Sequence, residues 1–238
     1  MMHIFLRLSF IVLFICCRTQ CYAAHANVAN NKPKTLSQKK AQLFLEEAYK
    51  ISERQSINLH ATLSVVNRGS NSPALANLSC IKNEETMIIS FGINQDEFQI
   101  ELNTEEMTTL KNGNKVNNYE TFSNLTPLSP IDLQYFLLIP KDLKYLCASK
   151  AAGRPSQVFE HEESASIGGT SFSKIKIYID NSWKIPLQID FLNSKNAVTR
   201  RLAVRSFKKV GSEWTLKMFE ISDFLSKKST KLTIIDFD

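Results

Sequence analysis

Alternation of apolar and polar residues is clearest in the last third of the chain, residues 174–238. Five short runs alternate there, and turn-rich breaks such as Gly211-Ser212 separate them. The runs read SKIKIYID, IPLQIDFL, RRLAVRSFKKV, EWTLKMFEI and TKLTIIDFD. A period of two residues places alternate side chains on opposite faces of a strand. The pattern therefore predicts a meander of antiparallel strands with one polar face and one apolar face.

The residues before this meander predict a long helix and further strands. Apolar residues at helical spacing predict an amphipathic helix that starts at Thr35 and runs for about 18 residues. Alternating runs from Ile57 to Lys115 predict strands, and the Asn112-Gly113 dipeptide among them is typical of a tight hairpin turn. More strands are predicted between Leu143 and Glu160.

A proline-rich segment, residues 121–140, interrupts the strands. Ser129 followed by Pro130 and Asp132 is typical of a helix start, and the apolar residues that follow predict a short helix over 132–138. We expect this helix to act as an apolar plug between two blocks of strands. The total is about ten strands and two helices, which predicts an α+β fold with one large antiparallel sheet and helices on one face. A fully closed barrel is the alternative, since a sheet of this length curls if it stays open.

The first 26 residues have the layout of a secretory signal peptide. An early positive charge, Arg7, precedes an apolar run that is too short to span a membrane, and small residues follow it. Ala24-His25-Ala26 fits a cleavage site. We therefore divide the chain into a signal peptide, 1–26, a flexible lead-in, 27–34, and a single domain, 35–238. We expect a periplasmic protein, and we prefer cleavage to a lipid anchor because the cysteines at the end of this region lack the small preceding residues that lipidation favours.

The charge and cysteine content exclude few classes of function. The formal net charge is +6, or +4 once Arg7 and Arg18 leave with the signal peptide, and the positive residues are scattered doublets. We interpret these doublets, Arg200-Arg201 among them, as a solvated surface, and we expect no nucleic-acid partner because no dense basic stripe is present. Two cysteines remain in the mature chain, Cys80 and Cys147. They predict a disulfide in an oxidising compartment, with two buried free thiols as the alternative.

No catalytic or metal-binding motif is recognisable in the sequence. The chain contains no GxSxG, no glycine-rich phosphate loop and no HExxH or Cys/His zinc spacing. We therefore expect a protein that is not an enzyme and that uses no cofactor or metal.

An ordered series of segments in residues 130–238 resembles the bacterial outer-membrane lipoprotein-sorting proteins, the LolA-like family. The segments are Ile131-Asp132-Leu133 with Phe136-Leu137, Ala152-Gly153-Arg154-Pro155, Ile177-Tyr178-Ile179-Asp180, Arg201-Leu202-Ala203-Val204, Phe207-Lys208-Lys209-Val210, Trp214-Thr215-Leu216-Lys217-Met218 and Thr230-Lys231-Leu232-Thr233-Ile234. The resemblance implies a strongly curved, incomplete β-barrel whose helices cover an apolar cavity on the concave face.

The resemblance implies a periplasmic carrier or binder of lipid or lipoprotein acyl chains that acts in outer-membrane lipoprotein sorting. The alternative is an envelope regulatory or interaction module of the same fold, which binds a partner protein without lipid transfer. Acyl chains are thus the expected partners, with inner- or outer-membrane envelope proteins as further candidates, and we expect a monomer. A concave face packed tightly against the two helices would favour the interaction module over the carrier.

We expect nine apolar residues from the predicted helices and strands to line the cavity, with plain core as the alternative. Which strand parity faces inward stays open, because a shift of one residue exchanges the two faces. The candidates are Phe44, Leu45, Ala48, Leu59, Leu63, Ile100, Phe136, Ile177 and Ile189.

Overall fold

The computed structural model describes residues 34–53, 57–67, 74–82, 86–93, 96–103, 107–122, 126–137, 139–140, 142–210 and 213–237. The predicted signal peptide and all but the last residue of the lead-in lie outside the described residues. Within them the chain forms two helices and one antiparallel sheet of thirteen strands. The elements are α1 (Gln38–Glu53), β1 (Ile57–Asn67), β2 (Ala74–Lys82), β3 (Met87–Ile93), β4 (Asp96–Leu102), β5 (Met107–Lys111), β6 (Asn114–Val116), α2 (Pro130–Leu137), β7 (Lys144–Ala151), β8 (Arg154–Ile167), β9 (Thr170–Asp180), β10 (Pro186–Leu192), β11 (Val198–Val210), β12 (Glu213–Asp223) and β13 (Lys228–Phe237).

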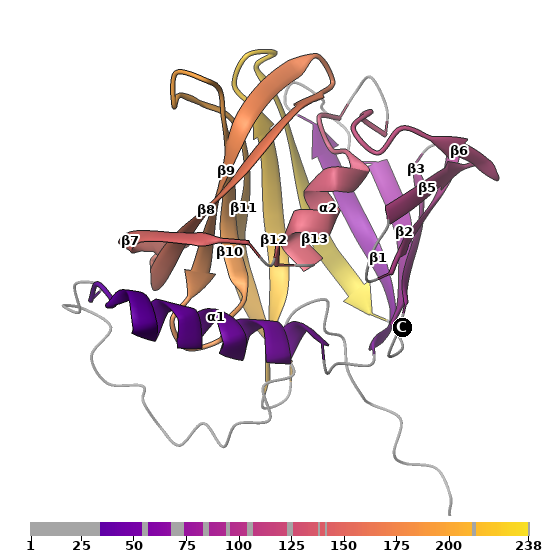
Figure 1. Ribbon diagram of the computed structural model, residues 1–238. Helices are drawn as coiled ribbons and strands as arrows, with labels where there is room; N and C mark the ends of the chain where they lie inside the picture. The colour runs from indigo at the N-terminus through magenta and orange to yellow at the C-terminus, as the bar shows by residue number, and fades with distance from the viewer. Residues whose placement is uncertain are drawn as a thin grey trace, which may run out of the picture.

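The first strand lies near the middle of the sheet, the next strands are added toward one edge, and the later strands are added from the opposite edge back to the middle. The strand order is β6-β5-β4-β3-β2-β1-β13-β12-β11-β10-β9-β8-β7. The first six strands run outward to one edge, and residues 117–143, which we call the crossing segment, carry the chain to the opposite edge. The remaining strands return until β13 pairs with β1. The sheet is therefore open, with β6 and β7 at its edges, and Figure 1 shows it curving around α2.

Two sequence expectations about the elements need correction. The sheet has thirteen strands among the described residues rather than about ten, because a strand as short as β6 holds too few residues for a period of two to show. Helix α1 begins at Gln38 and not at Thr35: its first helical hydrogen bond runs from the Ala41 amide to the Ser37 carbonyl, at 2.9 Å. The predicted turn at Asn112-Gly113 is confirmed, and both residues have positive φ, 50° and 79°, as a tight hairpin requires.

Helix α1 packs with its predicted apolar stripe against the end of the sheet near β8. Ala41, Phe44, Leu45 and Ala48 are buried, and the Phe44 ring stacks on that of Phe159 with centroids 5.9 Å apart. Polar contacts hold both ends of the helix in place. The Leu36 amide donates to the Tyr145 hydroxyl at 3.0 Å, the Tyr49 hydroxyl donates to the Pro140 carbonyl at 2.5 Å, and Lys184 pairs with Glu47 at 3.1 Å.

Candidate functional site

The structure places the predicted cavity residues whose side chains it describes in one continuous apolar core. Six of the nine have described side chains, and each is at most 7% exposed: Phe44, Leu45, Ala48, Ile100, Ile177 and Ile189. Phe136 lies in α2 and its side chain falls outside the described set. Leu59 and Leu63 are known by register only: Leu59 pairs with Cys80, and Leu63 pairs with Ala76 and Ile234, which are all buried.

The six described side chains are packed, which is the plain-core arrangement that the sequence analysis left open as the alternative. Ile100, Ile177 and Ile189 are 0% exposed, so no water-sized space adjoins them. Their burial fits a filled core. The inward parity is now known, because Ile177 and Ile189 pair across β9 and β10 and belong to the same core as α2.

Helix α2 supplies apolar side chains to the same core. Ile131, Leu133 and Tyr135 are each at most 8% exposed, and the Tyr135 ring packs edge-on against Phe191 of β10 at 5.9 Å. Phe191 in turn meets Phe172 of β9 at 5.0 Å. The predicted apolar helix within the proline-rich segment is thus confirmed, and it lies on the side toward which the sheet curves (Figure 1).

The other side of the curve is closed by three phenylalanines. Phe122 of the crossing segment packs edge-on against Phe91 of β3 and Phe98 of β4, with centroid distances of 4.4 and 4.9 Å. Phe91 and Phe98 stack on each other at 5.3 Å. Further along, Thr126 shares a 2.8 Å hydrogen bond with Thr230 of β13. The crossing segment is therefore pinned to the sheet before α2 begins.

A buried ion pair fastens the first turn of α2 to β11. The Arg200 guanidinium donates from Nε to Asp132 Oδ1 at 2.9 Å, and its Nη2 donates to Asp132 Oδ2 and to the Pro127 carbonyl. The backbone amide and hydroxyl of Ser129 also donate to Asp132 Oδ2, at 2.8 and 2.9 Å. Arg200 is 1% exposed and Asp132 0%, so both charges lie within the apolar core.

Arg200 contradicts the interpretation of the arginine doublet as a solvated surface. Successive side chains of a strand point to opposite faces, so Arg200 and Arg201 divide between the two sides of the sheet. The missed signal was the alternation of Arg200 with Leu202 and Val204, which are both buried. The predicted helix start at Ser129 is confirmed, because Asp132 accepts hydrogen bonds from Ser129. The sequence did not predict that Asp132 also pairs with Arg200.

On the outer face, Arg201 forms a matching pair with Asp190 of β10. The Arg201 guanidinium donates to both carboxylate oxygens, at 2.6 and 2.8 Å, and this carboxylate raises the pKa of Arg201. The Tyr178 hydroxyl donates to Asp190 at 3.3 Å. Burial, together with the Asp190 charge, raises the pKa of Tyr178 to about 12. This pair lies on the face of the sheet opposite to α2.

A polar chain links the crossing segment to β8. The Tyr119 hydroxyl donates to Glu163 Oε1 at 2.7 Å, and burial is the main cause of the raised pKa of Tyr119. His161 lies between two carboxylates, with Nδ1 3.0 Å from Asp142 and Nε2 3.4 Å from Glu163. The two ends of the crossing segment are thereby held to one strand. Within the described part of the chain, no three metal-ligating side chains cluster in a way that would hold a metal ion.

The two cysteines are not bonded to each other in the structure, so the predicted disulfide is not made. Cys80 is buried on β2, whereas Cys147 is exposed on the edge strand β7. Seven strands separate β2 from β7 in the sheet order, because the chain crosses to the far edge between them.

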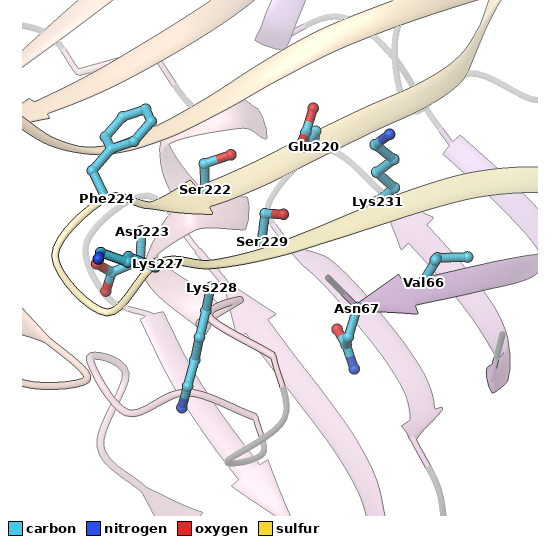
Figure 2. Close-up of a pocket in the computed structure, with 10 residues that line it drawn as sticks. All are labelled: Val66, Asn67, Glu220, Ser222, Asp223, Phe224, Lys227, Lys228, Ser229 and Lys231. Carbon is cyan, nitrogen blue, oxygen red and sulfur yellow. The ribbon is translucent and has the colours of Figure 1, made fainter. Parts of the chain in front are cut away.

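The described residues also line two hollows on the outer face of the sheet. One, of about 1060 Å³, crosses β1 to β5 and is lined mainly by polar side chains such as His60, Asn77 and Gln99. The other, of about 510 Å³, lies beside the turn between β12 and β13 (Figure 2). None of the helices in the described ranges has the length and apolar character that crossing a membrane would require.

Comparisons with known proteins identify the fold. A family model described as "-like: Uncharacterized protein" matches residues 141–238, within the segment where the sequence resemblance is strongest. A domain named as an outer membrane lipoprotein-sorting protein, from Vibrio parahaemolyticus, is 15% identical, with a TM-score of 0.66 over 85% of this chain and 93% of its own. A DUF1329 family protein from Desulfovibrio piger is 12% identical, with a TM-score of 0.62 over 84% and 91% of the two chains.

A LolA superfamily protein from Nitrosomonas europaea is 14% identical, with a TM-score of 0.57 over 83% of this chain and 92% of its own. No curated protein matches the sequence. The protein therefore has the LolA-like fold, an open and curved antiparallel sheet with few helices, as the sequence resemblance indicated. At these identities the likeness shows the fold alone.

Proposed function

We propose that this protein is a periplasmic binder of lipid or lipoprotein acyl chains, and that the chain enters the concave side when α2 moves away. The observation that carries the proposal is the buried Arg200–Asp132 pair, which fastens a short apolar helix over an apolar face. The concave side is filled by side chains of the protein, so the proposal requires α2 to move away before an acyl chain enters. The two helices together would then cover the concave face.

An ion pair such as Arg200–Asp132 is compatible with a helix that moves away from the sheet. The attraction between the charges of a buried ion pair is largely offset by the free energy needed to remove both charges from water. When the pair becomes exposed, water solvates the charges again and this free energy is recovered. Separation of Arg200 from Asp132 therefore costs less than separation of an apolar contact of equal size. An acyl chain compensates for the rest, because each buried methylene contributes about 0.8 kcal/mol. The equilibrium shifts only as far as the ligand prefers the open state.

The test is a kinetic one, and the sheet offers a matched control. Asp132→Asn keeps the shape of the side chain and removes its charge, so we expect faster uptake of a fluorescent fatty acid in stopped flow. Asp190→Asn makes the same change in the outer-face pair with Arg201, which does not touch α2, and should leave the uptake rate unchanged. Equal rates in all three proteins would remove α2 as the cover.

A second function has one specific observation in its favour. The concave residues are packed against side chains of both helices, and this packing favours an interaction module of the same fold unless α2 moves away from the sheet. The protein would then bind an envelope partner through its surface and carry no lipid. Mass spectrometry of the purified protein separates the two proposals, because a binder co-purifies with lipid and a module without a cavity does not. We propose for both that the protein is not an enzyme.

A further inference from the structure

The turn between β12 and β13, residues 223–228, presents two adjacent apolar side chains to solvent. Phe224 is 48% exposed and Leu225 is 64% exposed, although the apolar residues just before the turn, Phe219 and Ile221, are buried. An adjacent aromatic and aliphatic pair at the tip of a hairpin is unlike the isolated exposed residues that are normal on a surface. The turn therefore carries a small apolar tip, defined by Phe224 and Leu225.

The backbone holds this tip in its exposed position. Asp223 Oδ1 accepts from the amides of Leu225 and Ser226, both at 2.9 Å, and its Oδ2 accepts from the Thr170 hydroxyl at 2.8 Å. The Phe224 amide donates to the Thr199 carbonyl at 2.9 Å. These bonds tie the tip to β9 and β11, so its exposure is a property of the folded sheet and not of a loose loop.

Positive charge surrounds the tip. Lys227 and Lys228 follow it after Ser226, and with Lys231 they line the hollow of about 510 Å³ shown in Figure 2. Three lysines and two carboxylates, Asp223 and Glu220, line this hollow, and Arg205 pairs with Glu220 at 2.8 Å. The formal charge around the hollow is therefore positive.

The neighbouring turns add no exposed acid. Hairpins alternate between the two ends of an antiparallel sheet, so the turns at 167–170, 193–197 and 223–228 share one end, where Figure 1 shows their loops together. Among the residues of these three turns the sole acid is Asp223, which is 4% exposed. The crossing segment also reaches this end, since the Gly168 amide donates to the Tyr119 carbonyl at 3.3 Å, and it adds one exposed acid, Glu120. The three hairpin turns themselves combine apolar tip residues with lysines.

We propose that this end docks on the surface of an anionic lipid bilayer, with Phe224 and Leu225 in the interface and the lysines against the headgroup phosphates. Aromatic side chains favour the interfacial region, and lysines near an anionic surface each strengthen binding about fivefold. The charge of the hollow matches phosphate, which is why a bilayer is the occupant. The docking does not depend on whether the concave side takes an acyl chain.

Vesicle flotation of the chain from residue 27 onward tests the proposal. With vesicles of three parts phosphatidylcholine to one part phosphatidylglycerol, we expect binding that weakens at high salt, and none with phosphatidylcholine alone. Phe224→Ser with Leu225→Ser should weaken binding at least tenfold. Lys227→Asn with Lys228→Gln should weaken it about 25-fold and reduce the salt dependence. Asparagine suits position 227, where φ is 56°.

Two controls make the result specific to the tip. Ile81→Thr alters an apolar side chain that is 49% exposed on β2, and Lys39→Gln with Lys40→Gln removes two exposed charges from α1. Both control proteins should bind like the wild type. Absence of binding to anionic vesicles, or equal losses in the tip and control variants, overturns the proposal. Binding to an acidic protein without binding to vesicles would overturn it as well.

An environment-sensitive dye reads insertion directly. Leu225→Cys labelled with such a dye, in a Cys147→Ser background, should shift its emission to the blue when anionic vesicles are added. A dye that stays in water while the protein floats with the vesicles would contradict the proposed orientation.

Discussion

Replacement of Arg200 by methionine tests whether the buried pair holds α2 in place. The change removes three hydrogen bonds from the guanidinium, two to Asp132 and one to the Pro127 carbonyl, and leaves Asp132 buried with Ser129 as its partner. Removal of one member of a buried pair costs about 3–5 kcal/mol. Because Ser129 still donates twice to Asp132, we expect the lower part of this range, about 3–4 kcal/mol. For a domain of this size that lowers the melting temperature by about 6–16 °C.

The same substitution at Arg205 is the matched control. Arg205 lies on the same strand and pairs with Glu220, but its side chain is 47% exposed, so its loss should cost about 1 kcal/mol or less. Urea unfolding of both variants gives the two free energies. An Arg200→Met protein within about 1 kcal/mol of the wild type would refute the reasoning.

A double variant separates the ion pair from the packing of the arginine. Arg200→Met combined with Asp132→Leu removes both charges, and apolar replacements of a buried pair are often neutral or stabilising. We therefore expect the double variant to be more stable than Arg200→Met alone. A double variant that is less stable than the single one would show that the carboxylate contributes to stability without its arginine.

Three further predictions concern other parts of the sheet. Gly168→Ala should cost about 2 kcal/mol and Gly169→Ala about 1 kcal/mol in urea unfolding, because both have positive φ but only at Gly168 would the new methyl meet the crossing segment, at 3.0 Å. The free energy of unfolding should keep its full value below pH 10 and fall as the pH rises toward 12, because Tyr178 stays protonated in the folded protein after it ionises in the unfolded chain. Tyr178→Phe should make this fall less steep, and an unchanged slope would contradict the prediction. A thiol reagent should modify Cys147 rapidly and Cys80 only on unfolding, and protection of both would show that they pair.

Most of the strands were predictable from the sequence because their signals are local. Asn112-Gly113 specifies a tight hairpin through the positive φ of both residues, and Ser129-Pro130 starts a helix through local hydrogen bonds and a fixed φ. The apolar stripe of α1 likewise buries as its spacing indicated, with Ala48 0% exposed. Each of these features depends on residues within a few positions of one another.

The features that the sequence did not reveal depend on contacts between distant residues. Arg200 and Asp132 lie 68 positions apart, and only the crossing segment brings them together. The inward parity of Ile177 or Ile189 also depends on which face α2 covers, and a single strand does not contain that information. Cys80 and Cys147 stay apart for the same reason, since the chain passes from one edge of the sheet to the other between them.

The central claim is that the concave side binds an acyl chain. The most direct measurement is titration of a fluorescent palmitate analogue into the folded protein, with displacement by unlabelled palmitate. The account predicts saturable binding of one chain per molecule, with tighter binding in Asp132→Asn than in the wild type, because the open state becomes more populated. Absence of saturable binding in both proteins, while both unfold cooperatively, would contradict the account and favour the interaction module.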